Sequence, residues 1–149
     1  MMKKIFILLL FIITSCGYQP LYIKNKNNYK ISKVKFVEET SLGKKIYSSL
    51  PIEIIKNDKS INKLILSSKK NTIETSKDSK GQITSYRTSI TVKLSFLDYK
   101  DDLIKEKTLT KDFSYNTQDN KFKLREYQKN VVNSLVDKII EDIIIYLNM

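Results

Sequence analysis

The sequence predicts one α+β domain, a two-layer sandwich with two helices on one face of a four-stranded, mainly antiparallel sheet. Two observations suggest this architecture: alternate residues between 86 and 96 are apolar, and a wide apolar stripe with helical spacing runs through residues 127–144. A third is the order of the predicted segments, which is strand, helix, three strands and helix. The 149 residues, 41% of them hydrophobic, suffice for one domain with its own core.

The first strand is expected at residues 31–37, where apolar side chains alternate with lysines. A turn and a helix start should follow at residues 38–43, with Ser41 as the N-cap. A four-residue spacing then places one apolar face on this helix, made of Leu42, Ile46, Leu50 and Ile54. Because proline disrupts a helix interior, Pro51 predicts that the helix kinks there or ends near Leu50.

Three further strands are expected before the last helix. Residues 64–68 form a short apolar run, and the polar segment 76–81 predicts a hairpin turn. The strand through residues 86–96 alternates apolar and polar side chains, as in a sheet with one buried face. After a turn at residues 98–102, an antiparallel partner strand should carry on one side Leu103, Leu109, Phe113 and Tyr115.

A polar loop at residues 116–120 precedes the predicted C-terminal helix. Its apolar stripe is wide enough to cover a sheet, which favours core packing over a free interaction surface. The stripe consists of Tyr127, Val131, Leu135, Ile139 and Ile143, flanked by Val132, Val136, Ile140 and Ile144.

The N-terminus has the layout of an export signal. Lys3 and Lys4 precede an unbroken apolar stretch at residues 5–13. As a helix this stretch spans only about 14 Å, whereas the hydrocarbon core of a bilayer is roughly 30 Å thick. Residues 1–15 are therefore expected to be a cleaved signal peptide and not a permanent transmembrane helix.

Cys16 is the expected site of lipid attachment. The segment Ile13-Thr14-Ser15-Cys16 resembles the bacterial lipobox, in which small residues precede the cysteine that receives diacylglycerol. It is the only cysteine of the chain, so no intramolecular disulfide is available, and acylation would remove a lone thiol from an exported protein. Several acyl chains anchor a protein stably to a membrane. Gly17, in place of the aspartate that retains many lipoproteins at the inner membrane, favours the outer membrane.

These features divide the chain into three parts. Residues 1–15 are the signal peptide, residues 16–30 are the lipidated N-terminus and a polar tether rich in Asn and Lys, and residues 31–149 are the folded domain. The formal net charge of +11 suits anionic partners. Codon bias of an AT-rich genome is the alternative cause, because only Arg87 and Arg125 among the basic residues are arginines. Nucleic acid is disfavoured, since no basic run is interleaved with stacking aromatic residues.

No catalytic residue, cofactor or metal site is expected. The chain lacks histidine, and it has no glycine-rich phosphate loop or nucleophile elbow. The acidic group Asp98, Asp101 and Asp102 is a Ca²⁺ candidate, but three acids in a strand junction are more typical of a solvated turn. Glu38 and Glu39 are adjacent on a strand and point to opposite faces, so they are unsuited to acid–base catalysis at one atom.

Residues 16–22 read Cys-Gly-Tyr-Gln-Pro-Leu-Tyr. This motif resembles the mature start of the lipopolysaccharide-assembly lipoproteins of the LptE family, in the form found among alphaproteobacterial members. The resemblance implies a β-α-β-β-β-α domain with an amphipathic C-terminal helix, and only Cys16 carries over as a site residue. It also implies a non-enzymatic partner of the LptD β-barrel that helps to assemble lipopolysaccharide at the outer membrane, anchored on its periplasmic side.

Lipid A and core phosphates are anionic, so basic residues near the predicted hairpin between the second and third strands are candidate lipopolysaccharide contacts. They are Lys69, Lys70, Lys77, Lys80 and Arg87, for which a solvated turn is the alternative reading. Another lipoprotein role, as a barrel-assembly accessory or a secretin pilot, would share the anchor and the small size. A lipid-anchored enzyme or solute-binding protein is disfavoured, because the chain is short and lacks a second lobe.

Overall fold

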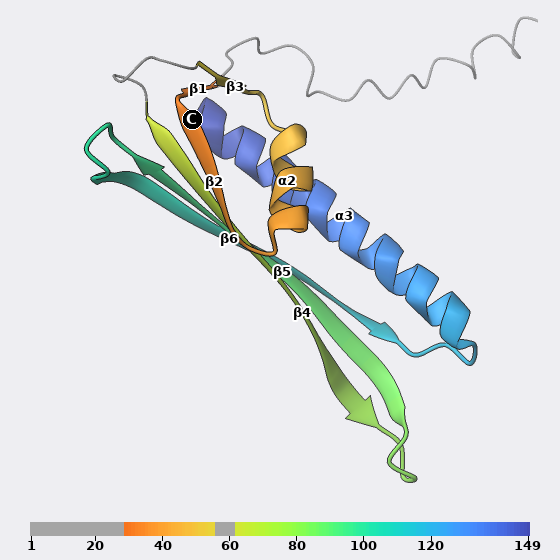
Figure 1. Cartoon of the computed structure of the whole chain (residues 1–149). Helices are drawn as coiled ribbons and strands as arrows, with labels where there is room; N and C mark the ends of the chain where they lie inside the picture. Colours follow the sequence, from red (N-terminus) through yellow and green to blue (C-terminus); the bar gives the residue numbers. More distant parts are fainter. Residues whose placement is uncertain (1–28, 56–61) are drawn as a thin grey trace, which may run out of the picture.

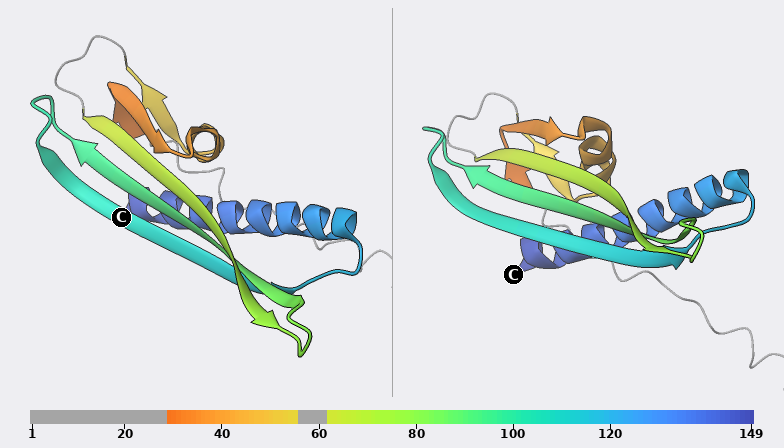
Figure 2. Two further views of the ribbon diagram at one scale, coloured as in Figure 1. Left: turned by 60° about the horizontal axis from the view of Figure 1, so that its bottom comes forward. Right: turned by 90° about the horizontal axis from the view of Figure 1, so that it is seen from below.

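The computed structural model describes residues 29–55 and 62–149 (Figure 1). The predicted signal peptide, the lipid-bearing Cys16 and all of the predicted tether except Tyr29 and Lys30 lie outside the described residues. The described part is a long, twisted sheet with both helices on one face, so the predicted two-layer α+β sandwich is confirmed (Figure 2).

The main sheet has the order β2-β4-β5-β6. Strand β2 runs parallel to β4, and the other neighbours are antiparallel. These strands are Lys33–Glu38 (β2), Lys63–Lys77 (β4), Ile83–Leu97 (β5) and Leu103–Asn116 (β6). The helices are Thr40–Ser48 (α2) and Lys121–Asn148 (α3). Helix α2 packs on β2 and β4, and α3 packs on β5 and β6.

A second, two-stranded parallel sheet joins β1 (Tyr29–Ile31) to β3 (Ile52–Ile54). The prediction that Ile54 lies on the helix face is wrong, because it belongs to β3 and is half-exposed. Helix α2 ends at Ser48, ahead of Pro51, as the proline predicted. The Pro51 carbonyl then accepts the Tyr29 amide at 2.9 Å, and the chain continues as a strand.

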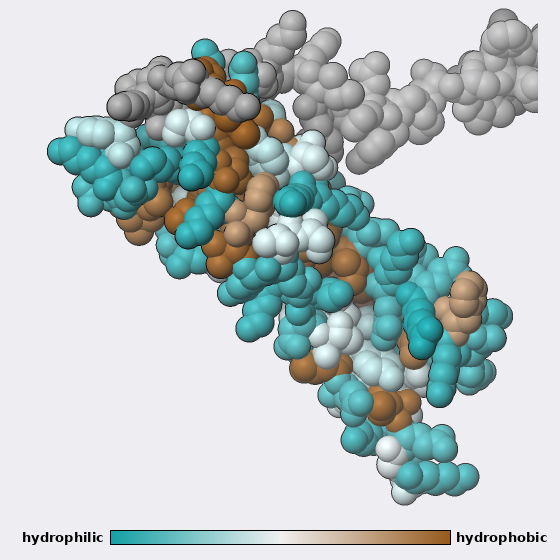
Figure 3. Space-filling model, viewed as in Figure 1, coloured by the Kyte–Doolittle hydropathy of each residue, from teal (hydrophilic) through white to brown (hydrophobic). Residues whose placement is uncertain are grey.

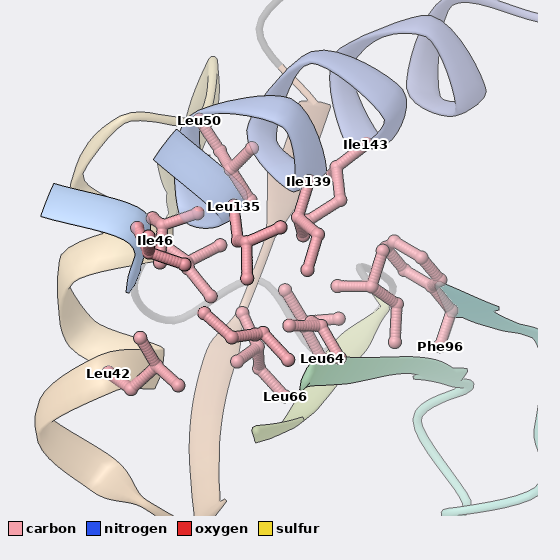
Figure 4. Packing of buried hydrophobic residues seen from close by; sticks show 14 of the residues in the cluster. Leu42, Ile46, Leu50, Leu64, Leu66, Phe96, Leu135, Ile139 and Ile143 are labelled. Carbon is pink, nitrogen blue, oxygen red and sulfur yellow. The ribbon is translucent and has the colours of Figure 1, made fainter. Parts of the chain in front are cut away.

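The core lies between the helices and the even-numbered side chains of β4 and β5. Leu64, Leu66 and every even residue of β5 from Ile90 to Phe96 are buried, as the alternation predicted. They meet the stripe of α3 and the inner face of α2 (Figure 4). The buried apolar side chains of the helices are Leu42, Ile46, Val131, Leu135, Val136, Ile139 and Ile143.

Glu39 joins α2 to the sheet. Its backbone N–H donates to the Ser68 carbonyl at 2.9 Å, its own carbonyl accepts the Ser68 hydroxyl at 2.8 Å, and its carboxylate accepts the Lys70 N–H at 2.9 Å. The helix begins at Thr40 with Glu39 in the N-cap position, so the prediction of Ser41 as the cap is wrong. Hydrogen bonds to β4 fix the N-terminus of α2, and a search for local capping residues in the sequence does not detect such bonds.

Strand β4 is three times as long as the predicted segment 64–68, because its polar half, from Lys69 to Lys77, pairs with β5. Across this half the Thr72 and Thr88 hydroxyls lie 2.9 Å apart, and Thr88 in turn lies 2.9 Å from the Tyr115 hydroxyl. Cross-strand pairing overrides a sequence with little hydrophobic alternation. The hairpin therefore projects past the helices at one end of the molecule (Figure 1).

Leucine truncations in and outside the core should differ sharply. Leu66→Ala removes a fully buried side chain and should lower the free energy of unfolding by about 2–5 kcal/mol. Leu103→Ala, the same change at a side chain that is 58% exposed, should cost less than about 1 kcal/mol. Urea unfolding monitored by circular dichroism measures both, and equal losses would contradict the placement of the core.

Candidate functional site

Within residues 29–55 and 62–149, both helices pack on one face of the main sheet and leave the opposite face, here called the open face, without a helix. In the regular part of the sheet, which ends at Glu74 in β4, odd-numbered residues of β2, β4 and β5 and even-numbered residues of β6 point to it, because the other parity packs against the helices. Its charged residues divide by strand. The basic ones lie on β2, β4 and β5 and are Lys33, Lys35, Lys63, Lys69, Arg87 and Lys93, whereas the acidic ones on β6 are Glu106 and Asp112.

Two ion pairs link the two groups of charges: Arg87 lies 3.8 Å from Asp112, and Lys93 lies 2.9 Å from Glu106. A third pair joins Lys63 to Asp101 in the β5–β6 turn at 2.7 Å. Within residues 29–55 and 62–149, no such bridge joins Lys33, Lys35 or Lys69 to a carboxylate. The open face therefore carries its uncompensated positive charge on the β2–β4 side.

A cleft of about 430 Å³ lies on this side, lined by Lys33, Lys35, Lys63, Ile65, Leu97 and Asp101. Lys33 and Lys63 occupy paired positions of parallel neighbouring strands, which lie about 4.8 Å apart. Like charges at paired positions repel and destabilise a sheet, and the Asp101 carboxylate offsets this repulsion at Lys63. An anion beside Lys33 and Lys35 would offset it further, while Ile65 and Leu97 offer an apolar surface beside it.

The turn that supplies Asp101 has an unusual backbone. In both hairpin turns an aspartate accepts two backbone N–H bonds: Asp78 accepts from Lys80 and Gln82, and Asp98 accepts from Lys100 and Asp102. The left-handed position of the first turn holds Gly81, with φ of 79°, whereas the second holds Asp101, with φ of 71°. A non-glycine residue there is strained, and Asp101 uses that position to reach Lys63.

The predicted lipopolysaccharide-contacting residues do not form one cluster. Lys69 and Arg87 lie on the open face, whereas Lys70 has the parity of the helix-covered face. Lys77 pairs with Glu74 at 3.3 Å, and the Lys80 amide donates to Asp78 in the turn. The prediction missed the cleft lysines. The lysines at positions 33 and 35 of the first strand were visible in the sequence, but the parallel pairing that brings Lys63 beside them was not.

The acidic turn residues have structural partners: Asp98 accepts the two turn N–H groups and Asp101 pairs with Lys63. Among the residues that the structure describes, no three acidic, cysteine or histidine side chains are grouped so as to hold a metal ion.

No helix within residues 29–55 and 62–149 combines the length and apolarity needed to cross a membrane. Figure 3 shows mostly hydrophilic residues on the visible face, with scattered hydrophobic patches.

No protein-family model matches the sequence, and no curated protein is significantly similar to it. Solved structures match the fold. The rare lipoprotein B of Shewanella oneidensis superposes with a TM-score of 0.59 at 10% identity, over 78% of this chain and 93% of that one. A minor lipoprotein of Acinetobacter baumannii gives 0.58 at 15% identity, over 78% and 87%. At these identities the similarity establishes a shared fold.

The ion pair of Glu106 should be visible by titration. The Lys93 ammonium holds the pKa of Glu106 below its ordinary value of 4.5, and the Ser95 hydroxyl adds a hydrogen bond at 3.2 Å. Because the folded-state pKa is depressed, the associated stability is present above the unfolded-state pKa and is lost as the pH falls through the folded-state pKa. Lys93→Met should raise the pKa of Glu106, measured by NMR of its side-chain carboxyl carbon.

Lys100→Met is the matched control for this titration. It removes a lysine whose Nζ lies near Tyr99 in the turn and makes no ion pair with Glu106. It should leave the Glu106 titration curve in place. An unchanged pKa in Lys93→Met would contradict the ion pair.

Proposed function

We propose that this chain is a lipid-anchored, non-enzymatic protein of the Gram-negative outer membrane that assists an LptD-like β-barrel in assembling lipopolysaccharide at the surface. The observation that carries the proposal is the fold shared with rare lipoprotein B of Shewanella oneidensis, which extends over 93% of that protein. Its name supports lipidation, for which Cys16 supplies the thiol. The motif at residues 16–22, with its resemblance to LptE-family lipoproteins, supports the barrel partner and the periplasmic side.

The charge of the open face supports the choice of ligand. Lipopolysaccharide carries phosphates close to acyl chains, and the cleft places Lys33, Lys35 and Lys63 beside the apolar side chains of Ile65 and Leu97. Lysines bind phosphate as point charges, most strongly where water is excluded. The hairpin residues Lys69 and Arg87 lie on the same face and would extend the contact along the sheet.

A different envelope machine is the second candidate, since a barrel-assembly accessory or a secretin pilot would also be a small anchored protein. The partner that co-purifies distinguishes the two. From outer membranes solubilised in mild detergent, the tagged full chain should retain a large LptD-like β-barrel at about equal stoichiometry, identified by mass spectrometry. A secretin, or barrel-assembly proteins alone, would contradict the proposal.

Cys16→Ala is the matched variant for this experiment. It should lose incorporation of radioactive palmitate and shift from the membrane fraction to the soluble fraction, because acyl chains supply the anchor. Recovery of the β-barrel with Cys16→Ala should then fall with membrane association. Palmitate labelling that persists in this variant would refute Cys16 as the lipid-bearing residue.

Cleft lysines should matter more for lipopolysaccharide binding than hairpin-tip lysines. The double variant Lys33→Gln/Lys35→Gln should weaken binding about tenfold at physiological salt, as expected for the loss of about 1.4 kcal/mol. Lys77→Gln/Lys80→Gln, with the same change in net charge, should have little effect. Displacement of a fluorescent lipopolysaccharide from the full chain measures both variants.

Thermal unfolding of the same variants separates binding from folding. Replacing Lys33 removes a repulsion with Lys63, so the melting temperature of the cleft variant should not fall. Equal loss of binding in both double variants would show that bulk charge alone attracts the lipid.

A further inference from the structure

Strand β6 forms one edge of the main sheet. It is a long strand, Leu103–Asn116, and in the part of the chain that the structure describes no strand pairs with its outer side. Unpaired N–H and C=O groups along an edge are a template for another strand. Whether this edge is protected depends on which backbone groups point outward and which side chains flank them.

The direction of the backbone groups follows from one hydrogen bond. The Thr117 N–H donates to the Thr84 carbonyl of the neighbouring strand at 2.9 Å. In an antiparallel pair, alternate residues point their backbone groups to the same side. In the ladder that pairs Ser85 with Asn116, the odd residues of β6 therefore face β5, and the outward groups belong to even residues, from Glu106 to Asn116.

Lysines protect this edge as far as Lys111. Lys105, Lys107 and Lys111 are odd-numbered and lie on the helix-covered side of β6. The Lys105 ammonium lies 4.8 Å from the ring centres of Tyr29 and Phe96, and Lys111 pairs with Asp142 of α3 at 2.7 Å. Inward-pointing charges of this kind discourage apolar strands from pairing with an edge. Only a strand with acidic side chains would suit the stretch beside Lys105 and Lys107.

Beyond Lys111 the edge carries aromatic residues in place of lysines. Phe113 and Tyr115 lie on the helix-covered side, where Tyr127 of α3 packs edge-on against Tyr115 with 5.6 Å between ring centres. Beside Phe113, a groove of about 240 Å³ opens between β6 and α3. Its floor is apolar and its rim polar, and it is lined by Phe113, Tyr127, Asn130, Val131, Ser134, Leu135 and Lys138.

The groove is accessible as well as apolar. Phe113 is 46% exposed and Tyr127 is 39% exposed, although both line an apolar hollow. A strand added outside β6 would point every second side chain toward the helix side, next to Phe113. A side chain of such a strand would therefore lie in the groove beside Phe113.

We infer that the outer edge of β6 accepts an extended segment of another protein as a fifth strand of the sheet. Every second side chain of this segment faces the helix side. These side chains are apolar beside Phe113 and acidic beside Lys105 and Lys107, so the edge selects a segment with one apolar end and one acidic end. Main-chain hydrogen bonds supply affinity, and the groove and the lysines supply specificity. This site lies on the opposite side of β6 from the β5 ladder and does not involve the cleft lysines.

A designed peptide tests the inference on the full chain in detergent. In the peptide, Thr alternates with Ile over the first half and with Glu over the second, and a scrambled peptide of equal composition is the control. Antiparallel addition should slow hydrogen exchange of the outward amides, among them Thr108, Thr110 and Asp112. The amides that face β5 should keep the exchange rates of the free protein.

Thr110→Pro removes one outward N–H, and a proline is tolerated on an edge strand where its nitrogen faces solvent. Thr110→Ala is the matched control, because both variants lose the side-chain contact with Thr91 but only the proline loses the N–H. The alanine variant should bind the peptide like the wild type, and the proline variant about tenfold more weakly. Protection of the β5 amides in both variants verifies folding.

Three results would overturn the inference. The first is equal binding of the scrambled peptide or no binding of the designed one. The second is equal affinity of the proline and alanine variants. The third is protection of the outward β6 amides in the free chain, which would mean that another part of this chain already covers the edge.

Discussion

The two-residue alternation of β5 is the constraint on which the structure depends. Its even residues from Ile90 to Phe96 are buried under the helices, and its odd residues face the open side with their neighbours on β4. Because β5 lies between β4 and β6, its register assigns a face to every residue of both. A shift by one residue would place Lys93 in the core and Leu94 in water. Burying a charge and exposing the apolar side chains of β5 makes such a shift strongly unfavourable.

Local patterns predicted those elements that carry a clear period. The alternation through residues 86–96 and the stripe of α3 from Val131 to Ile143 predicted the core correctly, whereas Tyr127, the first residue of the predicted stripe, is 39% exposed, and Pro51 marked the end of α2. Interactions distant in sequence account for the rest. The short β1–β3 ladder and the start of α2 at Glu39 depend on partners more than 20 residues away, and the polar half of β4 is held by its pairing with β5 across the hairpin, which its own local pattern does not show.

The candidate site was predictable only in part, for the same reason. Basic residues near the hairpin are visible in the sequence, but alternation sends Lys69 and Lys70 to opposite faces. The cleft requires that β2 and β4 run parallel, with Lys33 beside Lys63. Two of its features oppose stability, since the paired Lys33 and Lys63 ammonium groups repel and Asp101 occupies a backbone conformation that favours glycine, although the Lys63–Asp101 ion pair offsets part of this cost. Such local costs are typical of surfaces retained for binding.

The parallel strands at the start of the domain determine how it resists pulling. Tension on the chain ahead of Tyr29 would run along β1 into β2, and both strands pair side by side with parallel neighbours. Their hydrogen bonds are loaded together in shear, whereas a hairpin pulled open at its ends yields one bond at a time. The Lys105 ammonium against the Tyr29 ring adds a contact at the point where the force enters. A protein held to a membrane by this end could bear a pulling force without unfolding of its core.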